Sequence, residues 1–521
     1  MSAAPASVTS LSQQGTASPI EPDFTIFARG YDEGVPQVAW TRLVADLETP
    51  VSAMLKLAHE RPNSFLLESV EGGANRGRYS IIGCEPDLIW RANGARAEVN
   101  RAPQSDPQGF APSPLPALAS LRALLVESAI ALPPELPPMA AGIFGYMGYD
   151  TVRLIEDLPS DKRDPLALPH SILVRPTLIV IFDAVKDEMT VVTPVRPAPG
   201  VSAKAAYARA ADRLNLAIER LEQPLPHASE VGVTAPHPGP KAAILPEAYM
   251  AKVTRAKEYI AAGDIFQVVL SQRFEAPFTL PSFALYRALR RVNPSPFLYY
   301  LNFGDFAVVG SSPEILVRVR DGKVTIRPIA GTRPRGTTPE QDKVLSLELL
   351  HDAKERAEHL MLLDLGRNDV GRVAEVGSVR VTDSFFLEYY SQVMHIVSNV
   401  EGKLAADHDA VDALMAGFPA GTVSGAPKVR AMEIIDELED EARGIYAGCV
   451  GYFSADGNMD SCIVLRTSVV KDGVMYVQAG AGVVADSVPE REQAECVSKA
   501  RALFKAADEA VRFASRAKRG Q

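Results

Sequence analysis

The sequence predicts an α+β fold in which large antiparallel β-sheets are surrounded by helices. Segments typical of strands follow one another in adjacent runs, with hairpin-like turns at Gly304-Asp305 and Asp321-Gly322. Such runs favour antiparallel pairing over alternating β-α-β units. Residues 176–195 likewise indicate two β-branched strands joined by a polar turn, which is an antiparallel hairpin. No period of repeat length is present, so solenoids and propellers are not expected.

Composition divides the chain into four predicted segments. Residues 1–21 are rich in Ser, Ala, Thr and Gln and lack a basic stretch followed by an apolar run, so we expect a disordered tail rather than a signal peptide. Residues 22–222 mix short strands and helices and form a predicted N-terminal domain. Prolines recur through residues 223–246, which excludes a continuous helix or central strand and predicts a connection to a second domain, residues 247–513.

Several elements can be placed within these two domains. Two proline-rich interruptions, residues 102–116 and 131–138, are expected to be surface loops. An alanine-rich stretch at 202–221 predicts a helix, and an amphipathic helix from Glu247 is expected to end at Gly263. Strands are predicted to follow that helix at residues 268–270, 297–303, 306–312, 314–319 and 323–329.

Composition and charge exclude several classes of protein. With 521 residues, 47% of them hydrophobic and 23% charged, the chain has the composition of a soluble globular protein. A formal net charge of -10 argues against nucleic-acid binding, and no apolar run approaches the length of a membrane span. The cysteines form no C-x-x-C pair, so we expect reduced, packed thiols of a cytoplasmic protein; they are Cys84, Cys449, Cys462 and Cys496.

A helix that carries two glutamates on one face is predicted near the C-terminus. Ser487 and Glu490 have the spacing of a capping box, and Pro489 falls in the first turn, where its missing N–H costs nothing. A helix is therefore expected to begin there. Three side chains then project from one side of it, namely Glu492, Glu495 and Lys499.

A second predicted helix repeats this acidic pattern. Asp352 and Glu355 have the capping spacing, and Glu355 and Glu358 are three residues apart. Two E-x-x-E helices at the rim of a core could hold one hard cation, and carboxylate oxygens suit Mg²⁺, which takes one or two protein carboxylates and leaves other positions to water and an anionic substrate. The alternative is that both pairs are solvated helix faces, which is the commoner role of this spacing.

Eight sequence blocks resemble, in order, the chorismate-utilising enzymes. Within that family the resemblance is to component I of the anthranilate synthases, from about Asp23 to Phe513. The blocks are GDIFQVVLSQR (263–273), SSPEILVRV (311–319), RPIAGTRPRG (327–336), KERAEHLMLLDLGRND (354–369), VMHIVSNVEG (393–402), FPAGTVSGAPKVRAMEII (418–435), residues 446–453, and GAGVVADSVPEREQAEC (480–496). The resemblance implies that residues 22–222 are regulatory and that residues 247–513 are the chorismate-binding catalytic domain.

The resemblance also implies a Mg²⁺ site and a binding site for chorismate. Glu358 and Glu495 correspond to metal ligands, and Glu355 and Glu492 line the same site. A metal that bridges the ring carboxylate of chorismate would neutralise it and fix the ring. The second carboxylate and the remaining pocket have these counterparts: Gly331, Thr332, Thr422, Tyr446, Arg466, Gly480, Ala481, Gly482 and Lys499.

The implied reaction has two steps, and each needs a residue that transfers a proton. Ammonia attacks C2 of the ring while the C4 hydroxyl leaves, which gives aminodeoxyisochorismate; pyruvate is then eliminated to leave anthranilate. The leaving hydroxyl needs an acid, whose counterpart is Glu314, and the C2 proton needs a base, whose counterpart is His395. Without the resemblance, a histidine flanked by Val, Met and Ile would be assigned to the core.

Two positions distinguish this chain from other members of that family. Gln267 stands where hydroxylating relatives have a lysine base, and glutamine cannot deprotonate water. Ala330 stands where the relatives that make 4-amino-4-deoxychorismate have a nucleophilic lysine. The expected activity is therefore that of anthranilate synthase component I, in tryptophan biosynthesis. The alternatives are aminodeoxyisochorismate or 4-amino-4-deoxychorismate synthesis, and a catalytically silent tryptophan-sensing subunit.

Regulation and a partner subunit are also implied. FLLESVE (65–71) and NPSPFLYY (293–300) resemble the two parts of the family's tryptophan inhibitor site, whose counterparts are Ser69, Pro296, Phe297 and Leu298. No cysteine lies in the G-x-C-x-G turn of a glutamine amidotransferase, so ammonia is expected from a separate amidotransferase subunit in a hetero-oligomer. A shift of residues 142–150 between the two domains is one hypothesis for inhibition.

Overall fold

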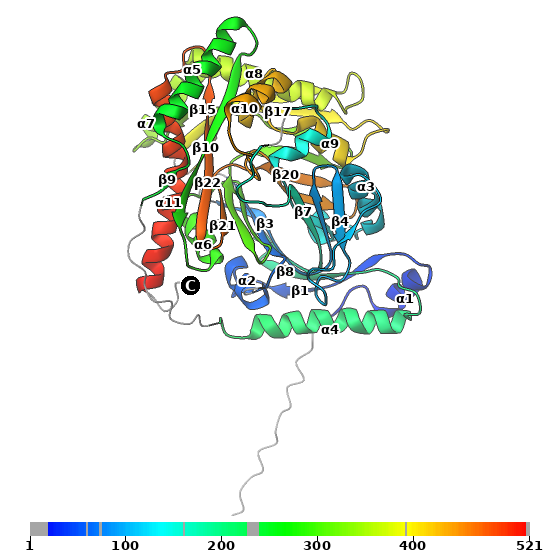
Figure 1. Cartoon of the computed structure of the whole chain (residues 1–521). Helices are drawn as coiled ribbons and strands as arrows, with labels where there is room; N and C mark the ends of the chain where they lie inside the picture. The colour runs from blue at the N-terminus through cyan, green and yellow to red at the C-terminus, as the bar shows by residue number, and fades with distance from the viewer. Residues whose placement is uncertain are drawn as a thin grey trace, which may run out of the picture.

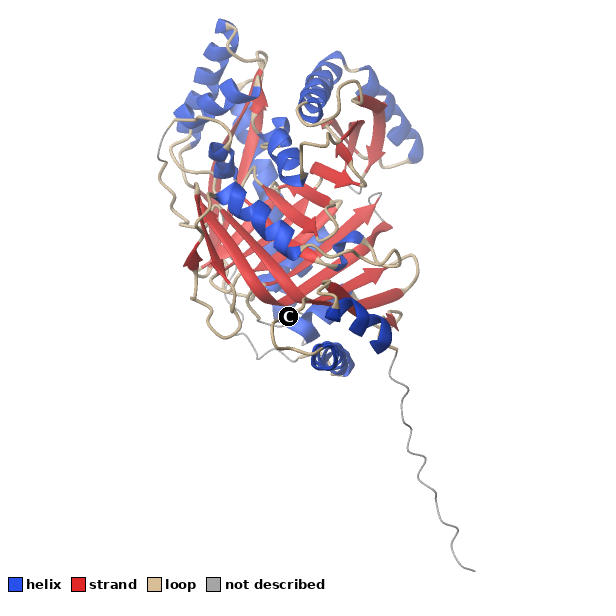
Figure 2. Ribbon diagram, turned by 90° about the vertical axis from the view of Figure 1, so that its right-hand side faces the viewer, coloured by secondary structure: helices blue, strands red, loops and turns tan. Residues whose placement is uncertain are grey.

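The computed structural model describes residues 19–58, 61–71, 75–159, 162–226, 239–390 and 393–516. Nearly all of the predicted disordered tail, and residues 227–238 of the predicted proline-rich connection, lie outside the described residues. Strands occupy the centre of the molecule and helices cover the outside (Figure 2). The predicted α+β fold with antiparallel sheets surrounded by helices is confirmed.

The strands of the described residues form one hydrogen-bonded network that branches into two arms. Its root pairs β1 with β8, β8 with β7, and β7 with β3, all antiparallel. The root strands are β1 (Gln37–Val44), β2 (Ser64–Glu71), β3 (Asn75–Asn93), β4 (Arg96–Asn100), β5 (Ala111–Pro112), β7 (Ser171–Asp183) and β8 (Glu188–Val195). The predicted hairpin at 176–195 is confirmed as β7 and β8.

The first arm leaves the root at β2, and the second leaves it at β7. The first runs through β11 (Phe297–Asn302), β12 (Phe306–Ser312), β21 (Thr467–Lys471), β22 (Val474–Val483) and β10 (Gln267–Pro277), with β9 (Lys241–Ala242) and β18 (Gly425–Ala426) beside β10. The second runs through β6 (Gly142–Met147), β19 (Cys449–Ser454), β20 (Met459–Ile463), β13 (Ile315–Arg320), β14 (Lys323–Ile326) and β17 (Val393–Lys403), which pairs with β15 (Ile329–Pro334) and β16 (Arg380–Tyr389).

Both arms join segments from the two halves of the chain. β2 pairs with β11 in the first arm, and β6 pairs with β19 in the second. Two strand pairs therefore join segments on either side of the predicted boundary at 223–246. The division into an N-terminal and a C-terminal domain stays a prediction.

The helices surround this network. They are α1 (Phe24–Asp32), α2 (Pro50–Ala58), α3 (Ala117–Ser128), α4 (Ala203–Glu222), α5 (Pro246–Ala262), α6 (Ser282–Val292), α7 (Pro339–His351), α8 (Ala353–Gly371), α9 (Ala410–Gly417), α10 (Lys428–Leu438) and α11 (Pro489–Arg516). Short 3₁₀ turns occur at η1 (Pro138–Ala140), η2 (Tyr149–Leu154) and η3 (Gly421–Val423). Figure 1 shows α8, α10 and β17 at the end of the molecule opposite to α4 and β1. In the part of the chain that the structure describes, no helix is long and apolar enough to span a membrane.

Helix boundaries follow the capping signals of the sequence. The Asp352 side chain accepts hydrogen bonds from the backbone amides of Lys354 and Glu355 at the start of α8, as its capping spacing predicts. Helix α11 begins at Pro489 as expected. Helix α5 ends at Gly263, which has φ 86° in the left-handed region that glycine adopts without strain.

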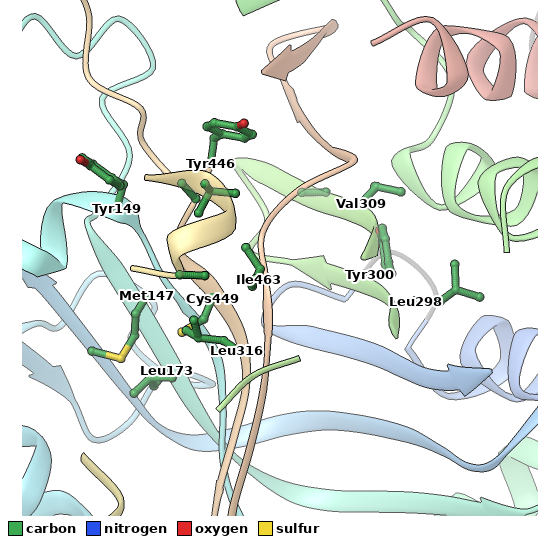
Figure 3. Packing of buried hydrophobic residues seen from close by; sticks show 14 of the residues in the cluster. Met147, Tyr149, Leu173, Leu298, Tyr300, Val309, Leu316, Tyr446, Cys449 and Ile463 are labelled. Atoms are coloured by element: carbon green, nitrogen blue, oxygen red, sulfur yellow. The ribbon is translucent and has the colours of Figure 1, made fainter. Parts of the chain in front are cut away.

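Both faces of the sheet network are buried. Along β7, Leu178 and Val180 belong to one hydrophobic cluster, and Ile179 and Ile181 belong to another. This alternation is expected because successive side chains of a strand point to opposite faces. Figure 3 shows how side chains from both halves, among them Met147, Leu298 and Ile463, pack in the first cluster. All four cysteines are free and buried.

Candidate active site

Two neighbouring segments connect the first arm to the second. One carries the predicted acid, Glu314, and the other carries the predicted carboxylate-binding arginine, Arg466. Glu314 lies between β12 and β13, and Arg466 lies between β20 and β21. The Ser311 amide donates to the Arg466 carbonyl at 3.2 Å, and the Ile463 amide donates to the Glu314 carbonyl at 3.0 Å. Arg466 has φ 50°, a conformation that non-glycine residues rarely adopt outside strained functional positions.

Glu314 is a buried carboxyl group that is suited to donate a proton. The Thr422 hydroxyl, on η3, donates to its Oε1 atom at 2.8 Å. Burial raises the pKa of Glu314 to about 8, although the hydrogen bonds from Thr422 and the Ile329 backbone and the charge of Arg466 each oppose the rise. The carboxyl group is therefore mostly protonated at neutral pH, as a general acid must be.

His395 is a buried histidine that stays neutral. Its Nδ1 atom lies 3.0 Å from the Gly331 carbonyl oxygen and 3.0 Å from the Thr332 hydroxyl oxygen. Since a carbonyl oxygen can only accept, the proton is assigned to Nδ1, which leaves Nε2 free as a base. Burial lowers the pKa of His395 to about 4, while the hydrogen bond to Gly331 opposes this.

A glycine turn brings the helix α8 close to His395. Gly331 has φ 69°, and a Cβ atom there would lie 3.2 Å from Glu355 Oε2. Strands β15 and β17 pair so that Thr332 faces His395. Glu355 also pairs with Arg333 at 3.1 Å, so this acid is close to the base and carries a counter-charge.

The first arm contributes the predicted glycine cradle on β22. A Cβ atom on Gly480 would lie 2.8 Å from the Tyr446 hydroxyl, and one on Gly482 would lie 2.8 Å from the Gln267 Nε2 atom. Both glycines therefore let a site residue approach the strand. Ala481, between them, points into the core and can offer only its backbone. The buried Gln267 Oε1 atom has no hydrogen-bond partner among the described residues.

The two acidic helices pack on different arms and approach each other. Helix α8 packs on β15 and β17, and α11 packs on β22. Burial raises the pKa of Glu358, and the charges of Glu355 and Glu495 raise it further. Burial and the Glu495 charge likewise raise the pKa of Glu492, against a hydrogen bond from Ser487. The four carboxylates are thus close enough to repel one another.

The acidic cluster of α8 and α11 also contains a lysine, and two of its carboxylates fit the ligand preferences of Mg²⁺. Lys499 Nζ lies 2.8 Å from Glu495 Oε1 and donates to the Gly480 carbonyl at 2.9 Å, so it links α11 to the glycine cradle. Within the described residues, no group of three or more His, Cys, Asp and Glu side chains could hold a metal ion. Two carboxylates are a sufficient protein contribution for Mg²⁺, and repulsion between hard oxygen donors is relieved by such a cation, so Glu358 and Glu495 fit the role.

A cavity lies between the two arms near their root, and we call it the root cavity. This cavity has a volume of about 340 Å³. It contains three of the four predicted inhibitor-site residues; Pro296 precedes them but does not line it. The lining includes Leu67, Glu68, Ser69, Tyr79, Ile81, Phe297, Leu298, Tyr299, Arg318, Arg320, Val450, Gly451, Tyr452 and Asp460.

One acid that lines the root cavity, Asp460, was not among the residues predicted for the inhibitor site. The Asp460 Oδ2 atom accepts from Arg318 Nε at 3.0 Å, whereas its buried Oδ1 atom has no partner among the described residues. Its only signal was an acidic residue inside an apolar strand. Tyr390 was also missed: its ring centroid lies 5.5 Å from that of His395, and its hydroxyl donates to Glu388 at 2.6 Å.

The fold and this site define a class of chorismate-binding proteins. Residues 75–505 match the family described as chorismate binding enzyme, and the chain belongs to that family. It is 57% identical over 497 residues to anthranilate synthase component 1 from Cereibacter sphaeroides, which covers 95% of this chain and 99% of the relative. It is 50% identical over 478 residues to anthranilate synthase component 1 from Thermus thermophilus, with 89% and 96% covered.

Solved structures show the same architecture. The crystal structure of anthranilate synthase component I from Streptococcus pneumoniae TIGR4 matches with a TM-score of 0.71 at 38% identity, covering 82% of this chain and 92% of that chain. The menaquinone-specific isochorismate synthase from Escherichia coli matches with a TM-score of 0.68 at 20% identity, covering 93% and 98%, and shares the fold. The resemblance expected from the sequence blocks is confirmed.

Proposed function

We propose that this chain converts chorismate and ammonia into anthranilate and pyruvate through aminodeoxyisochorismate, with Mg²⁺, as an early step of tryptophan biosynthesis. One observation carries this function: a buried acid that is protonated at neutral pH, Glu314, and a buried neutral base, His395, share one site. The charge of Arg466 reaches both of them. The names of the relatives, anthranilate synthase component 1, support the same chemistry.

In the first step Glu314 acts on the leaving group. A hydroxyl leaves readily only when it is protonated, and the Glu314 carboxyl supplies that proton. Hydrogen bonds from the Thr422 hydroxyl and the Ile329 backbone hold the Glu314 carboxyl group, whose own proton is donated to the C4 hydroxyl. The charge of Arg466 stabilises the carboxylate that remains.

Gln267 has a role in holding ammonia. Its unpartnered Oε1 atom can accept a hydrogen bond from an ammonia N–H, which directs the nitrogen lone pair toward the ring. A glutamine does not remove a proton, so the added nucleophile is ammonia rather than water. This assignment excludes the lysine-dependent hydroxylation expected of other relatives.

In the second step His395 removes the C2 proton and pyruvate leaves. Nε2 is free because Nδ1 is bonded to Gly331 and Thr332. The imidazolium that forms is stabilised by the Gly331 carbonyl and by the Glu388 charge, which both favour protonation. The driving force is the aromatic ring of the product.

Two groups of residues are proposed to bind the substrate's two carboxylates. When bound, Mg²⁺ supplies positive charge that neutralises the ring carboxylate. Glu358 and Glu495 would hold it, with Glu355 and Glu492 beside them. The enolpyruvyl carboxylate is bound by the Arg466 guanidinium, the Tyr446 hydroxyl and the backbone of Gly480 and Gly482, and Lys499 adds a charge; Gly331, Thr332 and Thr422 complete the pocket.

The root cavity is the proposed site of inhibition by tryptophan. Its volume of about 340 Å³ suits a small ligand. The unpartnered Asp460 Oδ1 atom and the Ser69 hydroxyl can receive the ammonium group, and Leu67, Phe297 and Leu298 offer apolar contacts for the indole. Ammonia is proposed to come from a separate glutamine amidotransferase subunit, and the name "component 1" of the relatives supports a partner.

An assay of the purified chain with chorismate, Mg²⁺ and ammonium tests this function. We expect anthranilate, detected by its fluorescence, without any amidotransferase. Release of 4-amino-4-deoxychorismate, accumulation of aminodeoxyisochorismate alone, or no turnover would contradict the proposed activity. Glu358→Gln and Glu495→Gln should each raise the Mg²⁺ concentration needed for half-maximal rate, and an unchanged requirement would remove these residues from the metal site.

A further inference from the structure

A buried arginine, Arg443, lies behind the proposed chorismate site and was assigned no role there. It is 4% exposed, and Glu439 pairs with it through two hydrogen bonds, Nε to Oε2 at 2.8 Å and Nη2 to Oε1 at 2.6 Å. Glu439 is in turn held by the backbone amide and hydroxyl of Ser271, at 2.7 Å and 3.0 Å. The ion pair is therefore fully hydrogen-bonded, as a buried pair must be.

The remaining donors of Arg443 reach two segments that carry site residues. Nη1 donates to the Val423 carbonyl at 2.7 Å, and Nη2 donates to the Val269 carbonyl at 2.6 Å. Val423 follows Thr422, whose hydroxyl holds Glu314, and Val269 is two residues after Gln267 on β10. One guanidinium group thus joins η3 to β10.

The same guanidinium group lies over the rings of two tyrosines, one from each half of the chain. Its carbon atom lies 5.6 Å from the ring centroid of Tyr446 and 4.9 Å from that of Tyr149. Both tyrosines are labelled in Figure 3, at the same end of the packed cluster. Tyr446 is the residue whose hydroxyl approaches Gly480, so Arg443 supports a proposed substrate contact directly.

We propose that Arg443 is a positioning residue that fixes η3, β10 and Tyr446 relative to one another, so that the enolpyruvyl carboxylate meets a preformed binding site; this inference rests on the proposed function. Arginine suits the position because its planar fork donates in several fixed directions while its face packs on an aromatic ring. Lysine keeps the charge and can still pair with Glu439, but it cannot reach both carbonyls in the same geometry.

The test compares Arg443→Lys with Arg175→Lys. Arg175 is a matched control because it is 6% exposed, pairs with Asp87 at 2.7 Å and donates to Ser128, far from the proposed chorismate contacts. In Arg443→Lys we expect the KM for chorismate to rise about tenfold or more, with a much smaller change in kcat, because the contact is made in both ground and transition states. Arg175→Lys should leave KM unchanged, and thermal unfolding shows whether both variants are folded.

A second variant tests the same role without leaving an unpaired buried charge that could prevent folding. Arg443→Met combined with Glu439→Gln removes both buried charges, so neither is left unpaired. The same rise in KM is expected, since the links to Val269 and Val423 are lost. A folded Arg443→Lys or double variant with the KM of the unsubstituted chain, or an equal rise in Arg175→Lys, would overturn the positioning role. Absence of turnover by the unsubstituted chain would instead contradict the proposed function.

Discussion

The proposed active site and the root cavity differ in whether their buried charged groups are paired. At Glu314 burial raises the pKa, and at His395 burial lowers it, so both groups favour their neutral forms. In each case burial outweighs the neighbouring groups that oppose the shift. In the root cavity, Arg318 and Arg320 are both paired with Asp460. Perturbed acids and bases suit proton transfer, whereas compensated charges around apolar walls suit binding without reaction. The comparison supports the proposal that proton transfer and inhibitor binding take place at different sites.

The proposed active site and the root cavity also contain residues from different parts of the chain. The residues proposed for proton transfer all come from the C-terminal half, whereas β2 and β3 of the N-terminal half line the root cavity. Yet β19 connects the two, since Val450 and Tyr452 line the cavity and Tyr446 precedes that strand by three residues. Substitutions can therefore affect chorismate turnover and tryptophan inhibition separately. If binding at the two sites is coupled, the protein must have two states that differ in affinity for each ligand.

The largest separation is expected from the catalytic side. His395→Ala removes the base, so anthranilate formation should fall by about 10²–10⁴-fold and aminodeoxyisochorismate should accumulate, as measured by chromatography of the products. His359→Asn is the matched control, because His359 is also buried with its pKa lowered to about 4, but its Nε2 atom lies 2.6 Å from the Ser398 hydroxyl. Unaltered anthranilate output from His395→Ala, or an equal loss in the control, would contradict the assignment.

A smaller effect is expected from the acid of the root cavity. Asp460→Asn should weaken tryptophan inhibition by about 10- to 100-fold, because a hydrogen bond to a charged group contributes about 1.5–3 kcal/mol. Chorismate turnover without inhibitor should change little. The measurement is the inhibition constant for tryptophan. As a control, Asp87→Asn removes an acid that pairs with Arg175 at 2.7 Å, and neither of these two residues lines the cavity. Normal inhibition of Asp460→Asn would exclude the proposed ammonium contact.

The pH dependence of kcat tests the protonation states that distinguish the proposed active site from the root cavity. His395 acts only when it is deprotonated, above its pKa of about 4, and Glu314 acts only when it is protonated, below its pKa of about 8. Activity should therefore fall at both extremes. The hydrogen bond from Thr422 lowers the pKa of Glu314, so Thr422→Val should move the alkaline limb to higher pH. A limb that moves to lower pH would indicate that Glu314 is not the acid.

The smallest expected effect concerns Ser69. Ser69→Ala removes one of the two proposed acceptors of the inhibitor's ammonium group. Because the Asp460 carboxylate still holds that group, we expect a loss of only about 0.5–1.5 kcal/mol, so inhibition should weaken about 2- to 10-fold. The same inhibition assay measures it. Ser64→Ala is the control, since Ser64 lies on the same strand β2 and donates to the Arg61 carbonyl at 2.8 Å, outside the cavity. Equal weakening in both variants would indicate a general loosening of β2 instead.

Part of the acidic site was predicted by sequence patterns alone. The capping spacing at Asp352 and the proline at the start of α11 placed Glu358 and Glu495 on helices, and the E-x-x-E spacing indicated a cation site. Which helices approach each other was not encoded in either stretch. The spacing of four residues already placed Lys499 beside Glu495, but the hydrogen bond from Lys499 to the Gly480 carbonyl depends on how α11 packs on β22.

Local sequence patterns were enough to specify the helix starts and hairpins, and the family blocks indicated which residues are proposed to react. Hairpins, helix starts and the stop at Gly263 follow from backbone preferences of a few adjacent residues. Tertiary structure alone decided that the Glu314 and Arg466 segments are hydrogen-bonded neighbours, that burial keeps His395 neutral, and that Asp460 retains an unpaired oxygen. These properties depend on packing between segments that are distant in the sequence, so a local pattern could not specify them.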